Sequence, residues 1–190
     1  MPKKISVLSC IIFLLCAILS IFFKTGAFAD GSFIFLEIAR HKEFTFIDYA
    51  RNHSTFLLQF FVIGAIRLGI TSFDSLFYIY NAGLVFWAAL FYSLSFFYFL
   101  NAKNIAGLYL SIITSSLLFI FCGFFVGNES VTGVAIFWLQ IAIILTQKNT
   151  LSKSSKLLLL LLSVLGLGYH QYFFGYSSIL LLALLAIRQK

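Results

Sequence analysis

The chain has 190 residues, of which 62% are hydrophobic and only 10% are charged, and its formal net charge is +7. So few charges exclude an ordinary soluble domain, which needs a polar surface, and the long apolar runs predict helices that cross a membrane. The positive charges lie in short loops and at the chain ends, as in cytoplasmic flanks of membrane helices, and do not indicate nucleic-acid binding.

Residues 5–23 form the first apolar run, which directly follows Lys3 and Lys4. The run is long enough to cross a bilayer and exceeds the usual core of a signal peptide, which is about 7–15 residues. "AFA" before Asp30 resembles a signal-peptidase site, so a cleaved signal peptide remains the alternative to an uncleaved first span. The three cysteines all lie in apolar runs without a CxxC spacing, and they indicate neither a disulfide framework nor a metal site.

Further apolar segments follow at residues 55–70, 75–100, 105–126, 131–146, 157–168 and 176–187. If every segment crossed, most Lys and Arg residues would lie outside, against the positive-inside rule. Segment 55–70 is the natural exception because it is short and contains Gln59 and Arg67. We therefore predict an all-α polytopic transmembrane bundle of about six crossings, in which 55–70 is an embedded helix that does not cross. Residues 1–190 then form a single transmembrane domain, and 24–74 form an external loop with amphipathic and embedded helices.

The charged stretch "ADGSFIFLEIARHKEFTFIDYARNHSTF" (29–56) lies outside in this topology. Glu37, Arg40 and His41 share one helical face by their spacing. The residues expected to face lipid are Phe33, Leu36 and Phe44. The structural alternative is an amphipathic helix on the membrane surface whose charges are merely solvated. At the end of the loop, Thr71-x-x-Asp74 predicts a helix capping box.

Two isolated acids are candidates for chemistry. Asp30 directly follows the first span, where a carboxylate can orient a hydroxyl, accept its proton or hold a divalent cation such as Mg or Mn. Glu129, in the short external loop "GNES", can supply a second oxygen ligand or act as a base. The structural alternatives are a helix end facing water for Asp30 and an acid favoured by the next helix dipole for Glu129.

Arg67 is a charge within an apolar segment and needs a partner or a path to water. A phosphate group suits its guanidinium, and snorkelling to the headgroups is the alternative. His170 and Gln171 sit among the aromatic residues of "YHQYFFGY", which make walls for a sugar or a lipid tail. Packing at the membrane interface is the alternative for this pair.

The chain has a recognisable order of segments. A first span ends in an acid and is followed by a long external segment with "FLLQFFVIGAIRLGI" and by a long aromatic span. Then come the acidic loop of "GNESVTGVAIFWLQIAIIL" and a basic loop. This layout resembles the N-terminal module of the GT-C superfamily, the polytopic glycosyltransferases that use sugars linked to polyprenyl phosphate. The resemblance covers most of the chain, and it rests on order and topology. Family enzymes usually continue with further spans or a soluble domain, so a fragment, or a module that needs a partner membrane subunit, is also consistent with the length.

The resemblance implies a glycosyltransferase of the bacterial cytoplasmic membrane, acting on its outer side, with Asp30 as the catalytic base and Glu129 assisting. The donor phosphate would lie near Arg51 or Arg67, and Glu37, His170 and Gln171 would contact substrate. No redox or nucleotide cofactor is expected because a Gly-rich phosphate loop is lacking. The alternative function is a non-catalytic subunit or carrier of lipid-linked sugars in surface polysaccharide assembly. A small transporter is disfavoured because the predicted crossings contain essentially no charges.

Overall fold

The computed structural model describes residues 7–8, 11, 14–15, 18–19, 21–23, 30–45, 52–118, 129–147 and 151–167. Throughout these residues the regular structure is helical and contains no strand, which confirms the all-α prediction for this part of the chain. The helices are α2 (Asp30–His41), α3 (Asn52–Arg67), α4 (Phe73–Asn101), α5 (Ile105–Leu118), α6 (Glu129–Thr146) and α7 (Lys153–Leu167). The predicted segment 176–187 lies outside the described residues.

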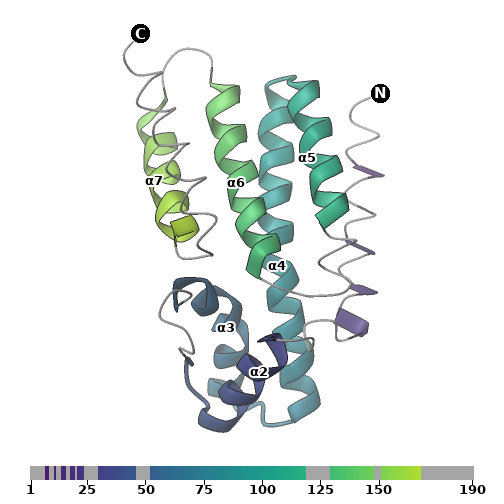
Figure 1. The fold of residues 1–190 in the computed structure, drawn as a ribbon, viewed down its shortest axis with the longest axis vertical. Coiled ribbons are helices and arrows are strands. Elements are labelled where there is room, and N and C mark those ends of the chain that lie inside the picture. The colour runs from purple at the N-terminus through teal and green to yellow at the C-terminus, as the bar shows by residue number, and fades with distance from the viewer. Residues whose placement is uncertain are drawn as a thin grey trace.

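Helix α4 is the axis of the molecule: α2, α3, α5 and α6 contact it, and α7 packs on α6 and α3 (Figure 1). The first half of α4 packs against α2 and α3 around a cluster that includes Phe35, Val62 and Tyr80. Its second half packs against α5 and α6 around a second cluster, which includes Phe99, Leu108 and Leu139 and extends to α7. The fold therefore has two apolar cores in series along one helix, with α2 and α3 at one end.

Local sequence explains where these helices begin and end. Gly69 ends α3 with a φ of 87°, and Ile70 N–H donates to Ala65 C=O, as in a Schellman cap. The N-cap of α4 is Ser72, whose hydroxyl accepts from Ser75 N–H at 3.5 Å. The predicted frame of the capping box was therefore wrong by one residue, because Ser72 and not Thr71 supplies the oxygen. Asp74 lies in the first turn of α4, where the helix dipole favours an acid.

Several hydroxyl groups of α4, α5 and α6 donate to carbonyl groups of their own helices. Ser95 donates to Tyr92 C=O at 2.7 Å, and Ser111 donates to Leu108 C=O at 2.9 Å. Thr146 donates to Ala142 C=O at 2.6 Å. Such back-bonding leaves these polar groups without a need for water, as an apolar environment requires.

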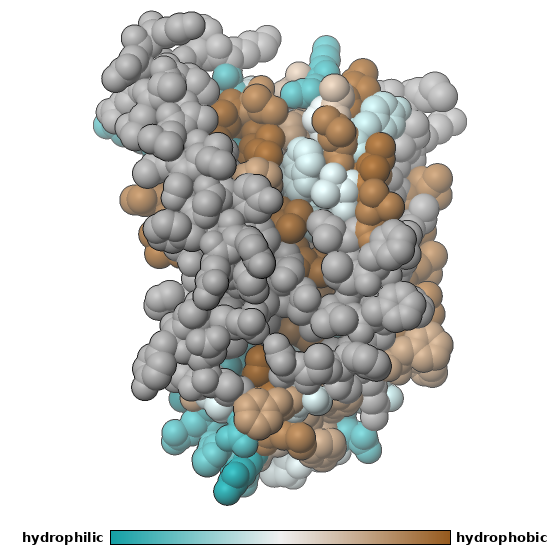
Figure 2. All heavy atoms as spheres, in the orientation of Figure 1, coloured by the Kyte–Doolittle hydropathy of each residue, from teal (hydrophilic) through white to brown (hydrophobic). Residues whose placement is uncertain are grey.

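The outward surface of these helices is apolar. Large exposed side chains include Phe86, Leu94 and Phe97 on α4, Leu110 and Ile113 on α5, and Leu157, Leu160, Leu161 and Val164 on α7. Figure 2 shows hydrophobic residues over the visible middle of the molecule and hydrophilic residues at its two ends. Within the described residues, one helix, Phe73–Asn101, is long and apolar enough to cross a membrane, while Ile105–Leu117 and Val131–Thr146 are apolar but shorter.

Candidate functional site at the α2–α3 end

Most of the charged residues that the structure describes lie toward the two ends of the molecule. Of the five described Asp and Glu positions, four belong to the end formed by α2, α3 and the start of α4, and the fifth, Glu129, begins α6 about midway along α4 (Figure 1). The opposite end, formed by the α4–α5 turn and the connection between α6 and α7, carries Lys103, Lys153 and Lys156. The candidate site is therefore the α2–α3 end, where acids and bases occur together.

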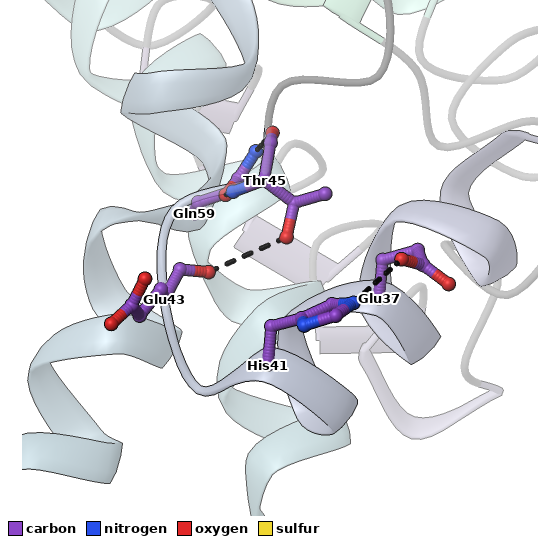
Figure 3. Close-up of polar contacts among 5 residues, drawn as sticks. All are labelled: Glu37, His41, Glu43, Thr45 and Gln59. Atoms are coloured by element: carbon purple, nitrogen blue, oxygen red, sulfur yellow. Dashed lines mark hydrogen bonds and ion pairs between the residues drawn. The ribbon is translucent and has the colours of Figure 1, made fainter.

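Helix α2 presents three different sides. Phe35 and Ile38 are buried against α3 and α4, and Phe33 and Leu36 are exposed. Between them, Glu37 Oε2 lies 3.3 Å from His41 Nε2 (Figure 3). This contact confirms that the residues four apart share one face, and it gives Glu37 a partner within its own helix.

Gln59 joins α3 to the segment that follows α2. Its Oε1 accepts from Thr45 N–H at 2.7 Å, and its Nε2 donates to Thr45 C=O at 2.7 Å (Figure 3). The side chain is fully buried, with 0% exposed. From the sequence, Gln59 is interpreted only as a polar interruption of an apolar segment. A buried carboxamide needs hydrogen-bond partners, so its place within an apolar helix could have indicated a bond to a neighbouring backbone.

An aromatic contact fixes the same segment beside Gln59. The ring of Phe44 stacks on Phe56, with centroids 4.7 Å apart and planes at 21°. Phe44 is half-buried and lies past the end of α2, so it does not continue the exposed side of that helix. Contact of its open side with lipid stays a prediction. Trp87 Nε1 donates to Leu57 C=O at 2.8 Å, which fastens α3 to α4 in turn.

The other predicted binding residues are placed unevenly. Arg67 is exposed in the last turn of α3, and no ion-pair partner is found for it within the described part of the chain. Arg51, His170 and Gln171 lie outside the described residues. The structure therefore leaves the grouping of these four residues a prediction.

Each of the two predicted catalytic acids is the first residue of a helix. Asp30 begins α2, and Glu129 begins α6. Helix α2 lies at the α2–α3 end, whereas α6 begins about midway along α4, where the rest of the bundle meets α2 and α3 (Figure 1). A helix N-terminus favours a carboxylate by about 0.3–1 kcal/mol. The structure describes these two residues by their backbones. Among the described side chains, no group of three or more His, Cys, Asp or Glu residues lies close enough together to hold a metal ion. We derive no step through a metal.

Comparisons with known protein families, with curated proteins and with solved structures found no match for this chain.

Proposed function

We propose that this chain is a polytopic membrane protein whose α2–α3 end faces away from the cytoplasm. Between the charged ends, residues 75–101, 105–118, 130–146 and 157–167 contain no Asp, Glu, Lys or Arg. The described Lys and Arg residues are divided equally: Arg40, Lys42 and Arg67 belong to the α2–α3 side, and Lys103, Lys153 and Lys156 to the opposite end, where none of the described carboxylates lies. Over the full sequence, the six-crossing topology places eight Lys and Arg residues on the Lys103 side and five on the other. This excess is the observation that carries the proposal, because cytoplasmic loops are the ones enriched in Lys and Arg.

The length of α4 fits this placement. Its 29 residues extend about 43 Å at 1.5 Å per residue, which matches a bilayer of about 40–45 Å with its headgroups. Asp74 and Lys103 then lie at opposite headgroup levels. Helix α3 packs beside the first half of α4, which supports an embedded helix that does not cross. The six-crossing arrangement includes the first apolar run and segment 176–187.

For the activity, we propose transfer of a sugar from a polyprenyl-phosphate donor on the outer side. The acceptor hydroxyl oxygen attacks the anomeric carbon, the bond from that carbon to the phosphate oxygen breaks, and polyprenyl phosphate leaves with the electron pair. Asp30 takes the proton of the hydroxyl, and the sugar carbon inverts. Glu129 assists from the start of α6, and Arg67 or Arg51 pairs with the donor phosphate. The chain acts alone or with a partner membrane subunit.

Two features of the α2–α3 end support this assignment. Both acids begin helices that start on the α2–α3 side of α5, α6 and α7, Asp30 within the α2–α3 end and Glu129 where α6 meets it, and we propose that the donor phosphate lies between them. Arg67 is exposed at that end and available to an anion, and a guanidinium pairs with phosphate through two parallel hydrogen bonds.

The test is sugar transfer from a polyprenyl-phosphate sugar donor in membranes that contain Asp30→Asn or Asp48→Asn at matched protein levels. Asp48 is another acid of the charged stretch 29–56 and serves as the control, since we expect it to be a surface charge whose loss costs little. Loss of a positioned base lowers a rate by about 100- to 10,000-fold, so Asp30→Asn is expected to lose activity and Asp48→Asn to keep it. Equal loss in both variants would contradict a specific role for Asp30. Unchanged transfer in both would remove Asp30 from catalysis, and the absence of transfer by the unaltered protein would favour the non-catalytic carrier.

A further inference from the structure

Helix α2 has an exposed apolar stripe that its packing does not use. Phe33 and Leu36 are 53% and 52% exposed, and Arg40, four residues further on, is exposed on the same side. The opposite side is already filled, because Phe35 and Ile38 are 1% and 0% exposed. The helix therefore buries one apolar side in the protein and presents a second one outward.

The position of α2 along α4 sets the level of this stripe. The ring of Phe35 lies 5.1 Å from Phe73, 4.7 Å from Phe77 and 5.5 Å from Tyr80, measured between centroids. Helix α2 is thus fixed beside the first two turns of α4. In the membrane placement proposed above, those turns lie near the headgroups, since α4 has about the length of the whole bilayer.

The charges at the end of the stripe suit lipid phosphates. Arg40 and Lys42 are both exposed and follow directly on the apolar residues, while Glu37 is turned aside toward His41. Glu43, which follows Lys42 in the chain, is exposed as well. An apolar stripe that ends in Arg and Lys is typical of helices that lie in the membrane interface, about 5–10 Å into the boundary between headgroups and acyl chains.

We infer that α2 is an interfacial helix: Phe33 and Leu36 enter the acyl boundary of the outer leaflet, and Arg40 contacts phospholipid phosphates. The inference rests on the membrane placement of α4, but not on sugar transfer. The same stripe would otherwise be covered by a second copy of the chain or by another protein, or face water.

The test uses a variant without Cys10, Cys16 and Cys122, with one spin label at a time at positions 36, 41 and 86. The protein is placed in vesicles of phosphatidylethanolamine and phosphatidylglycerol, and collision of each label with oxygen and with a water-soluble nickel complex is measured. Phe86 is 46% exposed near the middle of α4 and reports the centre of the membrane, and His41 reports the polar side of α2. We expect the ratio of oxygen to nickel accessibility to be highest at position 86, intermediate at 36 and lowest at 41.

The outcomes separate the inference from the placement on which it depends. A label at position 36 that matches position 41 would put α2 in water and overturn the inference. A label at 36 that is shielded from both reagents would mean that protein covers the stripe, which also overturns it. High nickel accessibility at position 86 would instead overturn the membrane placement of α4. If Leu36→Cys does not fold, Phe33→Cys tests the same stripe.

Discussion

Gln59 holds the backbone of Thr45 with both atoms of its carboxamide, at 2.7 Å each, across fourteen positions of sequence. The carboxamide thus supplies hydrogen-bond partners for Thr45 N–H and C=O, as the backbone of a neighbouring strand would in a sheet. The two bonds fix the segment after α2 onto α3. Because Phe44 stacks on Phe56 beside them, α2 and α3 are joined at a second place besides their apolar contact. The α2–α3 end is thus a structured unit and not a loose external loop.

Gln59→Leu should destabilise the protein, because it leaves Thr45 N–H and C=O without partners in a half-buried place. Each unsatisfied group costs about 1–3 kcal/mol when buried, so we expect a clear fall in the thermal unfolding midpoint in detergent and faster tryptic cleavage after Lys42. Thr45→Val is the control, since Gln59 binds only the backbone of this residue. An equal fall in both variants would contradict the role given to Gln59.

Gln59→Glu makes the same contact sensitive to pH. A carboxyl can both accept from Thr45 N–H and donate to its C=O only when it is protonated, and burial raises its pKa because the charged form is disfavoured. A group with a raised pKa in the folded state contributes stability at low pH and loses it as pH rises. The variant should therefore unfold at a lower temperature at pH 8 than at pH 5, relative to the unaltered protein at each pH.

Gly69 and Gly64 give opposite predictions for the same substitution. A Cβ at either position would meet no atom within 4 Å, but Gly69 has a φ of 87° and Gly64 lies within α3. Gly69→Ala should lower the free energy of unfolding by about 1–2 kcal/mol through left-handed strain. Gly64→Ala should raise it by about 0.5–1 kcal/mol through a smaller loss of backbone entropy on folding. Thermal unfolding of both variants in one detergent checks this pair, and a fall at position 64 would mean that lipid or protein fills the space there.

Gly107 lets α5 approach α4 closely. A Cβ there would overlap the ring of Phe99, which is fully buried. Gly107→Ala should therefore destabilise the protein by about 1–3 kcal/mol, as overpacking does. In the double variant with Phe99→Leu, the added cost of the alanine should shrink, because neighbouring substitutions couple. Simple additivity of the two unfolding free energies would contradict the close contact.

If Arg67 pairs with the phosphate of the polyprenyl-phosphate sugar donor, its substitution should weaken phosphate binding. Arg67→Lys keeps the charge but loses the two-pronged geometry, so binding of a short-chain polyprenyl phosphate, measured by titration in detergent, should weaken while expression stays normal. Arg67→Gln should weaken it further. Equal binding by Arg67→Gln would mean that the side chain only reaches for the headgroups.

The helical elements could be predicted because each apolar segment is long and bounded by polar residues. The predicted segment 75–100 and α4 (Phe73–Asn101) differ by two residues at the start and one at the end. The spacing of Glu37 and His41 predicts that they share one helical face, and the structure has them in contact there. The cap of α4 was misplaced because Thr71 and Ser72 are adjacent hydroxyl residues, and the pattern alone does not choose between them.

Contacts between distant segments could not be read from spacing. Gln59 and Thr45 carry no shared motif, and only their placement shows that the amide meets a backbone. Phe44 looks like a continuation of the apolar residues of α2, but the helix ends at His41 and the chain turns at Lys42, with a φ of 58°. Periodicity no longer applies beyond such a turn, and tertiary contact decides the direction of the side chain. The roles of Asp30 and Glu129 remain predictions.

The proposed membrane placement is tested most directly by finding on which side of the membrane each end of the molecule lies. Single cysteines at Glu37 and at Ser154, which lies at the start of α7, are introduced into the variant without native cysteines and treated with a membrane-impermeant maleimide in bacterial spheroplasts. We predict labelling of position 37 in intact spheroplasts and of position 154 only after the membrane is opened. Labelling of both positions before opening, or of position 154 alone, would contradict a membrane-spanning bundle whose α2–α3 end faces outward.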